Sequence, residues 1–296
     1  MSHAIIEALA IFGAGIAAGT INTVVGSGTL ITFPTLLAFG YPRVLANVSN
    51  NVGLVPGVAS GVYGYRAELT GQRRRVIRLG SASVCGGLLG AILLLVLPAE
   101  AFKAIVPALI GLALVLVVAQ PWLAKWVAAR QRARENAPGS RVKGRAAVSG
   151  PGTEGGWYEP AGDEGENAGS GRPETSEANA TGGLILWILV FATGIYGGYF
   201  GAAQGVLLIG LLGIAFTDSL QRINAVKNVL ACVVNAVAAA VFIAATHVDW
   251  GVAALIAAGS IIGGQIGARV GRRLPPWGLR AVIVCVGLVA LIRLLA

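Results

Sequence analysis

Long apolar stretches alternate with short polar or glycine-rich breaks along this chain of 296 residues. Most of these stretches approach the roughly 20 residues that an α-helix needs to cross a bilayer. Ten apolar segments run approximately over residues 4–24, 28–40, 45–65, 79–97, 102–124, 183–201, 204–217, 223–246, 251–270 and 277–295. The pattern predicts an all-α polytopic membrane protein.

The second and seventh segments are shorter than a full span, and each follows a glycine-rich break. The break is Gly26-Ser27-Gly28 in the first case and residues 201–205 in the second. Such segments are tilted spans, half-helices or re-entrant hairpins, and the sequence leaves these alternatives open.

Composition favours a lipid-exposed surface over a water-exposed one. Only 12% of the residues are charged, about half the fraction of an ordinary soluble domain. Eight of the 13 acidic residues lie between positions 135 and 177, so the apolar segments contain almost no carboxylates. A charge at the centre of a bilayer costs roughly 2.5–3.5 kcal/mol even on the mildest scales, which explains their absence there.

The net charge of +9 does not indicate nucleic acid, because the basic residues stand in short stretches between apolar segments. Three isolated cysteines form no CxxC pair or Cys/His cluster, so we expect no disulfide framework, no metal site and no cofactor. Mid-segment carboxylate pairs and the HExxH and GxSxG motifs are missing as well, and we expect no enzyme activity.

Residues 125–182 differ from the rest of the chain. They begin basic and become acidic and rich in Gly, Pro, Ser and Glu, a composition that cannot bury enough apolar area to order itself. We expect a disordered cytoplasmic linker between a first membrane repeat, 1–124, and a second, 183–296. A small regulatory module is the alternative.

The two membrane parts are related by a shift of 177 positions. The shift superimposes glycines, two pairs of asparagines and a Leu-Pro step, which is not easily a chance result. Matching residues are Gly28 and Gly205, Asn47 and Asn224, Asn51 and Asn228, Gly90 and Gly267, and Pro98 and Pro275.

Charge predicts that these repeats are inverted. The loop after the third segment is basic at Arg73, Arg74, Arg75 and Arg78, whereas its counterpart at 246–250 has no Lys or Arg. Basic short loops stay in the cytoplasm, so matching loops face opposite sides. Five segments per half satisfy this arrangement and place both termini outside. Inverted repeats with interrupted helices are typical of secondary transporters.

Polar side chains gather at two equivalent places in the halves. The first place is the break, where an exposed helix start offers backbone N–H groups to an anion; close helix packing is the alternative role of its glycines. Candidate site residues here are Asn22, Ser27, Gly28 and Thr29 in the first half and Gln204 and Gly205 in the second.

The second place lies near the start of the third segment of each half. Residues four positions apart share a helix face there, and Lys227 lies a full turn inside an apolar segment. We expect Lys227 to neutralise an anionic substrate; an interfacial or structural lysine is the alternative. Candidate site residues here are Asn47, Asn50, Asn51, Asn224, Lys227 and Asn228.

Two stretches are similar to a known family. Residues 18–36, AGTINTVVGSGTLITFPTL, resemble the opening signature of the sulfite exporter TauE/SafE family, and residues 197–205, GGYFGAAQG, resemble its second-half signature. The resemblance implies a multi-pass permease of a bacterial inner membrane. It also implies small sulfur-containing anions, such as sulfite, sulfoacetate and related sulfonates, as substrates.

These observations together predict a permease that moves a small anion by alternating access where the repeats meet. Its expected partners are that anion and the lipid bilayer, and a homo-oligomer is compatible with the sequence. A channel or carrier for a cation or a neutral metabolite is the main alternative, and a membrane scaffold is a third.

Overall fold

A computed structural model describes residues 2–135, 183–216 and 218–270, together with positions 284, 285, 288, 291 and 292. These residues form helices and connecting turns, without a strand among them, which confirms the predicted all-α class. Residues 136–182 of the expected linker, 125–182, and most of the tenth segment, 277–295, lie outside the described residues.

The helices match the predicted segments closely in both halves. In the first half they are α1 (Ser2–Val24), α2 (Thr29–Ala38), α3 (Arg43–Gly64), the short 3₁₀ helix η1 (Arg66–Leu69), α4 (Arg73–Val96) and α5 (Ala99–Glu135). In the second half they are α7 (Gly183–Tyr199), α8 (Gln204–Ala215), α9 (Leu220–Ala245) and α10 (Trp250–Val270). The short second and seventh segments are therefore short helices that begin directly after the breaks.

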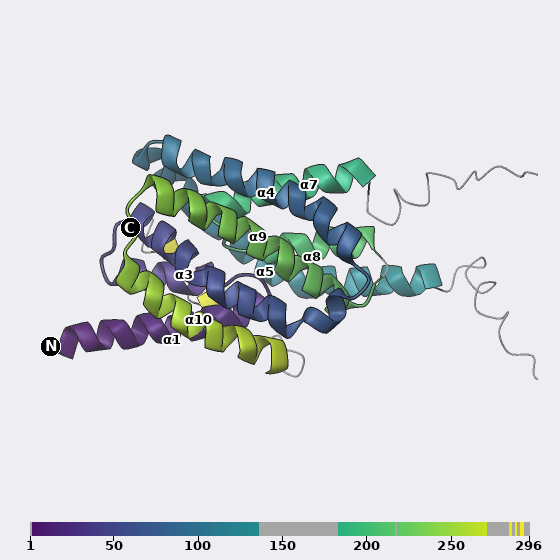
Figure 1. Ribbon diagram of the computed structural model, residues 1–296, viewed down its shortest axis with the longest axis horizontal. Helices are drawn as coiled ribbons and strands as arrows, with labels where there is room; N and C mark the ends of the chain where they lie inside the picture. The colour runs from purple at the N-terminus through teal and green to yellow at the C-terminus, as the bar shows by residue number, and fades with distance from the viewer. Residues whose placement is uncertain are drawn as a thin grey trace, which may run out of the picture.

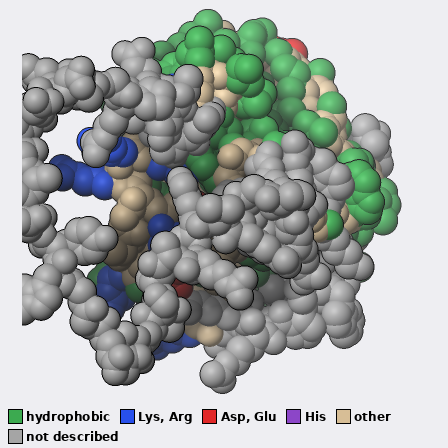
Figure 2. Space-filling view, turned by 90° about the vertical axis from the view of Figure 1, so that its right-hand side faces the viewer, with side chains coloured by type: hydrophobic (Ala, Val, Ile, Leu, Met, Phe, Trp, Pro, Cys, Tyr) green, Lys and Arg blue, Asp and Glu red, His purple; other side chains and the backbone are tan. Residues whose placement is uncertain are grey.

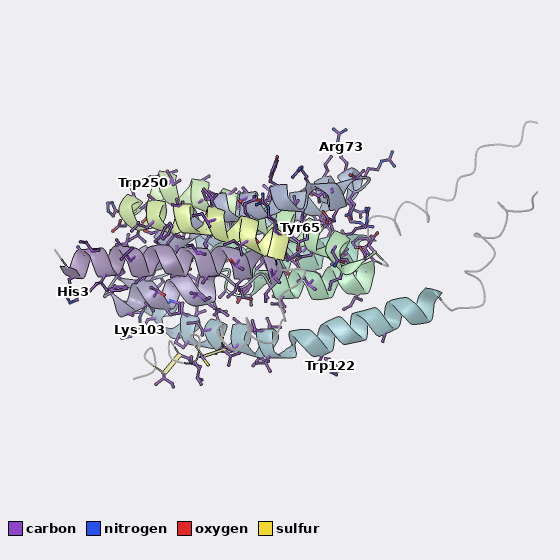
Figure 3. The ribbon with its side chains drawn as sticks, turned by 90° about the horizontal axis from the view of Figure 1, so that it is seen from below. His3, Tyr65, Arg73, Lys103, Trp122 and Trp250 are labelled. Carbon is purple, nitrogen blue, oxygen red and sulfur yellow. The ribbon has the colours of Figure 1, made fainter. Side chains whose placement is uncertain are left out.

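Helix α5 corrects one expected boundary. It continues to Glu135, whereas the apolar segment ends at 124 and the linker was expected to begin at 125. Residues 125–135 are rich in Ala, Arg, Lys and Gln, which are strong helix formers, so the helix persists after its apolar part has ended. Figure 3 shows α5 extending past Trp122, away from the other helices.

Five helices of the described residues are long and apolar enough to cross a membrane: α1, α4, α5, α9 and α10. Helix α3 has 22 residues but falls outside this group. Asn47, Ser49, Asn50 and Asn51 lower its hydropathy, and all four are buried against other helices. Polar residues in α3 thus face protein and not lipid, as is usual for polar groups inside a membrane.

The helices pack as two groups, and each group takes helices from both halves. Helix α1 packs against α10, which also packs against α3, while α4 packs against both α7 and α9. Figure 1 shows α4 beside α7 along one edge of the molecule and α1 beside α10 along the other. Helices α3 and α9 join the two groups at the centre.

Glycines allow the helix backbones in each group to touch. A Cβ atom on Gly263 would overlap the carbonyl oxygen of Ile16 in α1, and one on Gly86 would overlap that of Phe191 in α7. Lipid tails are as apolar as leucine side chains, so helices in a membrane associate mainly through such close packing. The shared glycine pattern of the halves therefore has a direct packing role.

The contacts also fix helix directions. Asn51, near the start of α3, contacts Asn235 in the later part of α9, whereas Tyr65, just after α3, packs with Ala225 near the start of α9. Helices α3 and α9, which match each other in the 177-residue shift, consequently run in opposite directions.

The two ends of the molecule differ in charge. Figure 3 places Tyr65 and Arg73 at one end and His3, Lys103 and Trp250 at the other. Figure 2 views the first of these ends and shows Lys and Arg side chains gathered there, with hydrophobic side chains along the flank. The exposed residues Arg66, Arg73 and Arg74 belong to this basic end.

We expect Gly86→Ala to lower the melting temperature of the detergent-solubilised protein, because the added methyl group meets the α7 backbone. Overpacking of this kind costs about 1–3 kcal/mol. Gly80→Ala, in the same helix, is the matched control, since a Cβ there meets nothing within 4 Å. It should be neutral or stabilising, and equal losses for both variants would contradict the close α4–α7 packing.

Candidate functional site

Each half contains a break in which the backbone turns sharply between two helices. In the first half, Gly26 has a φ of 89° between α1 and α2. In the second half, Gly201 has a φ of 76° and Ala203 a φ of 144° between α7 and α8. Ala203 stands where the 177-residue shift places Gly26, so an alanine occupies a conformation that favours glycine.

The two breaks lie against each other. The amide of Gly205 donates a hydrogen bond to the carbonyl of Gly26 at 3.2 Å. A Cβ on either glycine would overlap the Cα of the other. An anion can therefore enter between these two positions only if the breaks separate.

Lys227 of α9 is fully buried beside this contact, with its Cδ 3.1 Å from the place of a Cβ on Gly205. Its ammonium donates hydrogen bonds to the carbonyl of Asn22 at 3.0 Å and to that of Thr23 at 3.2 Å. Both carbonyls belong to the last turn of α1, where backbone acceptors have no partner within the helix. The negative end of the α1 dipole also favours a cation at this place.

Two asparagines complete this cap. The side-chain amides of Asn224 and Asn228 donate to the carbonyl of Thr23 at 3.1 Å and 3.3 Å. All three α9 side chains predicted from the sequence therefore converge on the end of α1. A helix of the second half thus caps a helix of the first.

A helix of the first half makes one corresponding contact with a helix end of the second half. Asn47 of α3 donates to the carbonyl of Tyr199, the last residue of α7, at 3.0 Å. Asn51 donates to the side chain of Asn235 at 3.5 Å, at the α3–α9 crossing. Asn50, the counterpart of Lys227, instead stays within its own half: it donates to Thr29 at 3.4 Å and accepts a short hydrogen bond from Thr32.

Several buried polar atoms near the breaks have no hydrogen-bond partner. They are Oγ of Ser27, Oδ1 of Asn51 and Oδ1 of Asn224. Leaving a buried polar group unpaired costs about 1–3 kcal/mol, so such groups are uncommon and call for an explanation. Of these atoms, only the Ser27 hydroxyl can donate to an anion, because the amide oxygens of Asn51 and Asn224 only accept hydrogen bonds.

Lys227 is the one charged residue in the buried class among the described residues. The ion pairs of the basic end join Asp218 to Arg75 at 2.6 Å and to Arg222 at 3.3 Å, and they do not include Lys227. The described residues also contain no group of three His, Cys, Asp or Glu side chains that could hold a metal ion.

Most of the candidate residues lie near the two breaks in the structure, and one neighbouring asparagine was not among the candidates. Gln204 packs against Gly197 of its own half. Asn235 was missed because its counterpart in the shift, Val58, is apolar, although an asparagine in an apolar helix was itself a signal. The role of all these residues in binding stays a prediction.

A separate cavity of about 200 Å³ lies at the end of the molecule that carries Trp250. Glu7, Tyr41 and Asp249 contribute its polar lining. The Tyr41 hydroxyl donates to Glu7 at 2.7 Å. Burial, and then this hydrogen bond, raise the pKa of Tyr41 to about 12, so the hydroxyl stays protonated at neutral pH. Sequence reasoning did not find this group.

The chain matches a known family. The profile of the family described as Sulfite exporter TauE/SafE matches residues 11–294. A relative from Sinorhizobium sp, named probable membrane transporter protein ORF9, is 29% identical over 100 residues, which are 34% of this chain and 38% of that protein. The match thus spans under two fifths of the relative's length. No solved structure matches the chain significantly.

We expect Ala203→Gly to stabilise the protein by on the order of 1 kcal/mol, because glycine adopts a positive φ without the steric cost that alanine pays. Gly201→Ala is the reciprocal change and should destabilise by about 1–2 kcal/mol. Melting temperatures in detergent measure both effects. A lower melting temperature for Ala203→Gly would contradict the strained backbone at this break.

Proposed function

Because the chain belongs to the sulfite exporter TauE/SafE family, we propose that it is a multi-pass permease of the cell (inner) membrane for a small anion, sulfite or an organosulfonate. The observation that carries this proposal is the meeting of the two breaks beside the fully buried Lys227. Its ammonium, the amide donors of Asn224 and Asn228 and the start of α2 all favour negative charge. Family membership supports transport and not catalysis.

Alternating access at the junction of the halves is the proposed mechanism. Its support is that α3 and α9 run in opposite directions, as an inverted repeat requires. Each packed group also contains helices of both halves, so one group can move against the other along the α3–α9 contact. Movement of this kind would separate Gly26 from Gly205 and admit the anion.

The buried ammonium argues against the cation-carrying alternative. A cation at the breaks would lie close to the Lys227 ammonium. Among the described residues, no buried carboxylate lies there to compensate the two positive charges. Like charges brought together in a low dielectric repel strongly, so this arrangement selects against cations.

We expect Lys227→Gln to reduce anion flux about tenfold or more, because hydrogen bonds to charged groups contribute about 1.5–3 kcal/mol. Glutamine still has an amide that can donate to the α1 carbonyls, so the fold should persist. Sulfite efflux from proteoliposomes, with a melting curve of each variant, measures both properties.

Lys103→Gln is the matched control for that experiment. Lys103 is exposed in α5, at the end of the molecule that also carries His3 and Trp250. It undergoes the same loss of charge and should retain flux close to that of the unmodified protein. Undiminished flux in Lys227→Gln would remove Lys227 from the transport pathway.

The inverted relation of the halves has a separate test. Positions 73 and 250 match in the 177-residue shift, and Figure 3 shows Arg73 and Trp250 at opposite ends of the molecule. Single cysteines at these positions, with Cys85, Cys232 and Cys285 replaced by alanine, should react with an impermeant maleimide from opposite sides of the membrane. Labelling of both from one side would refute the inversion.

A further inference from the structure

A carboxylate links two arginines at the basic end of the molecule. The Nη1 of Arg75, in α4, lies 2.6 Å from Oδ2 of Asp218, and the Nε of Arg222, in α9, lies 3.3 Å from Oδ1 of the same carboxylate. Arg75 belongs to the first half of the chain, whereas Asp218 and Arg222 belong to the second. One carboxylate therefore bridges two guanidinium groups at a boundary between the halves.

Both guanidinium groups have further contacts that hold them in place. Arg75 lies over the ring of Phe216, 3.6 Å from the ring centroid, and donates to the side chain of Gln72. Arg222 donates to the carbonyl of Thr70 at 3.1 Å. Neutral groups thus position the two arginines together with the carboxylate, and the pair would stay close together if the carboxylate moved away.

The arginine pair has an unused donor and is partly exposed. The Nε of Arg75 is buried and has no hydrogen-bond partner. Side chains of Arg75, Asp218 and Arg222 keep 16%, 25% and 35% of their accessible surface, so a small solute can reach the network. Guanidinium groups bind oxyanions through their N–H donors, and a carboxylate is itself such an oxyanion.

The repeat indicates that the fold does not require this network. In the 177-residue shift the counterparts of the three charged residues are uncharged; they are Val252 for Arg75, Tyr41 for Asp218 and Leu45 for Arg222. Tyr41 and Val252 line the cavity of about 200 Å³ at the opposite end, and its described lining contains no Lys or Arg. Where the basic end has an ion network, the other end therefore has a cavity.

The arginine pair also lies close to the breaks along the chain. Helix α8 begins at the second break and ends at Ala215, three residues before Asp218. On α9, Arg222 precedes Lys227 by five residues, which is about 7.5 Å along the helix axis. An anion held by the two arginines would thus be between one and two helical turns from the buried lysine.

We infer that Arg75 and Arg222 form a second binding site for a small oxyanion, which the Asp218 carboxylate occupies in this structure. The carboxylate and a free oxyanion compete for the same guanidinium groups. Because Asp218 is part of the chain, its effective concentration at the pair is high. Binding at the pair does not depend on transport; its role as the first site of the transported anion rests on the proposed function.

Removal of the competing carboxylate tests the site. Purified protein in detergent without phospholipid is melted over a series of sulfite concentrations, with chloride keeping the ionic strength constant. We expect Asp218→Ala to reach half of its thermal stabilisation at a sulfite concentration about tenfold or more below that of the unmodified protein, because the tethered competitor is gone. An unchanged or higher midpoint in a folded Asp218→Ala protein would overturn the inference.

Three further variants make this result specific. Arg75→Gln in the Asp218→Ala background should abolish the gain, and a gain that persists would overturn the assignment to Arg75. Glu100→Ala removes an exposed carboxylate at the start of α5 and should leave the midpoint unchanged, so it controls for net charge. Asp218→Asn keeps the size of the side chain, should shift the midpoint in the same direction, and decides the question if Asp218→Ala does not fold.

A lipid headgroup carries similar oxygens, so a parallel melting series uses short-chain phosphatidylglycerol in place of sulfite. Stabilisation of Asp218→Ala by sulfite supports a site for a free oxyanion. Stabilisation by phosphatidylglycerol alone would overturn it in favour of a lipid site.

Sulfite efflux from proteoliposomes separates this inference from the proposed function. Arg75→Gln should raise the sulfite concentration for half-maximal flux about threefold or more and keep the maximal flux, because an initial binding contact is lost. An unchanged half-maximal concentration would overturn the role of the pair in anion entry. If the unmodified protein transports no anion, the proposed function fails, and the melting series still decides whether the arginine site exists.

Discussion

The structure depends on how the carbonyls at the end of α1 are satisfied. Inside a membrane no water is available to donate hydrogen bonds to these carbonyls, and each unpaired backbone group costs several kcal/mol. The donors come from α9, where Asn224, Lys227 and Asn228 reach the carbonyls of Asn22 and Thr23. A helix of one half must therefore stay beside the break of the other half, and this requirement brings the two breaks together.

Glycine makes that junction possible. Gly26 and Gly205 meet at backbone distance, and the α1–α10 and α4–α7 packings bring helix backbones equally close. Each packed group consequently contains helices from both halves, joined through α3 and α9. The α3–α9 packing, the α9 cap on α1 and the contact of the two breaks all cross from one group to the other.

The halves are alike in backbone but different in chemistry. Matching positions hold Asn50 and Lys227, Gly26 and Ala203, and Val58 and Asn235. The repeat thus supplies the frame, and these substitutions give it one buried charge, one strained alanine and one additional amide.

The sequence by itself determined the described helices and their approximate ends, because the length of an apolar segment is a local property. It also named the candidate polar positions, because comparison of the two halves in the 177-residue shift needs no structure. It did not determine the end of α5, because residues 125–135 are polar but still have a high helix propensity. Only the tertiary structure decided that Lys227 faces the α1 carbonyls, that Asn50 stays within its own half and that Asn235 meets Asn51. Those outcomes depend on which helices cross, and periodicity along one helix carries no information about the register of another.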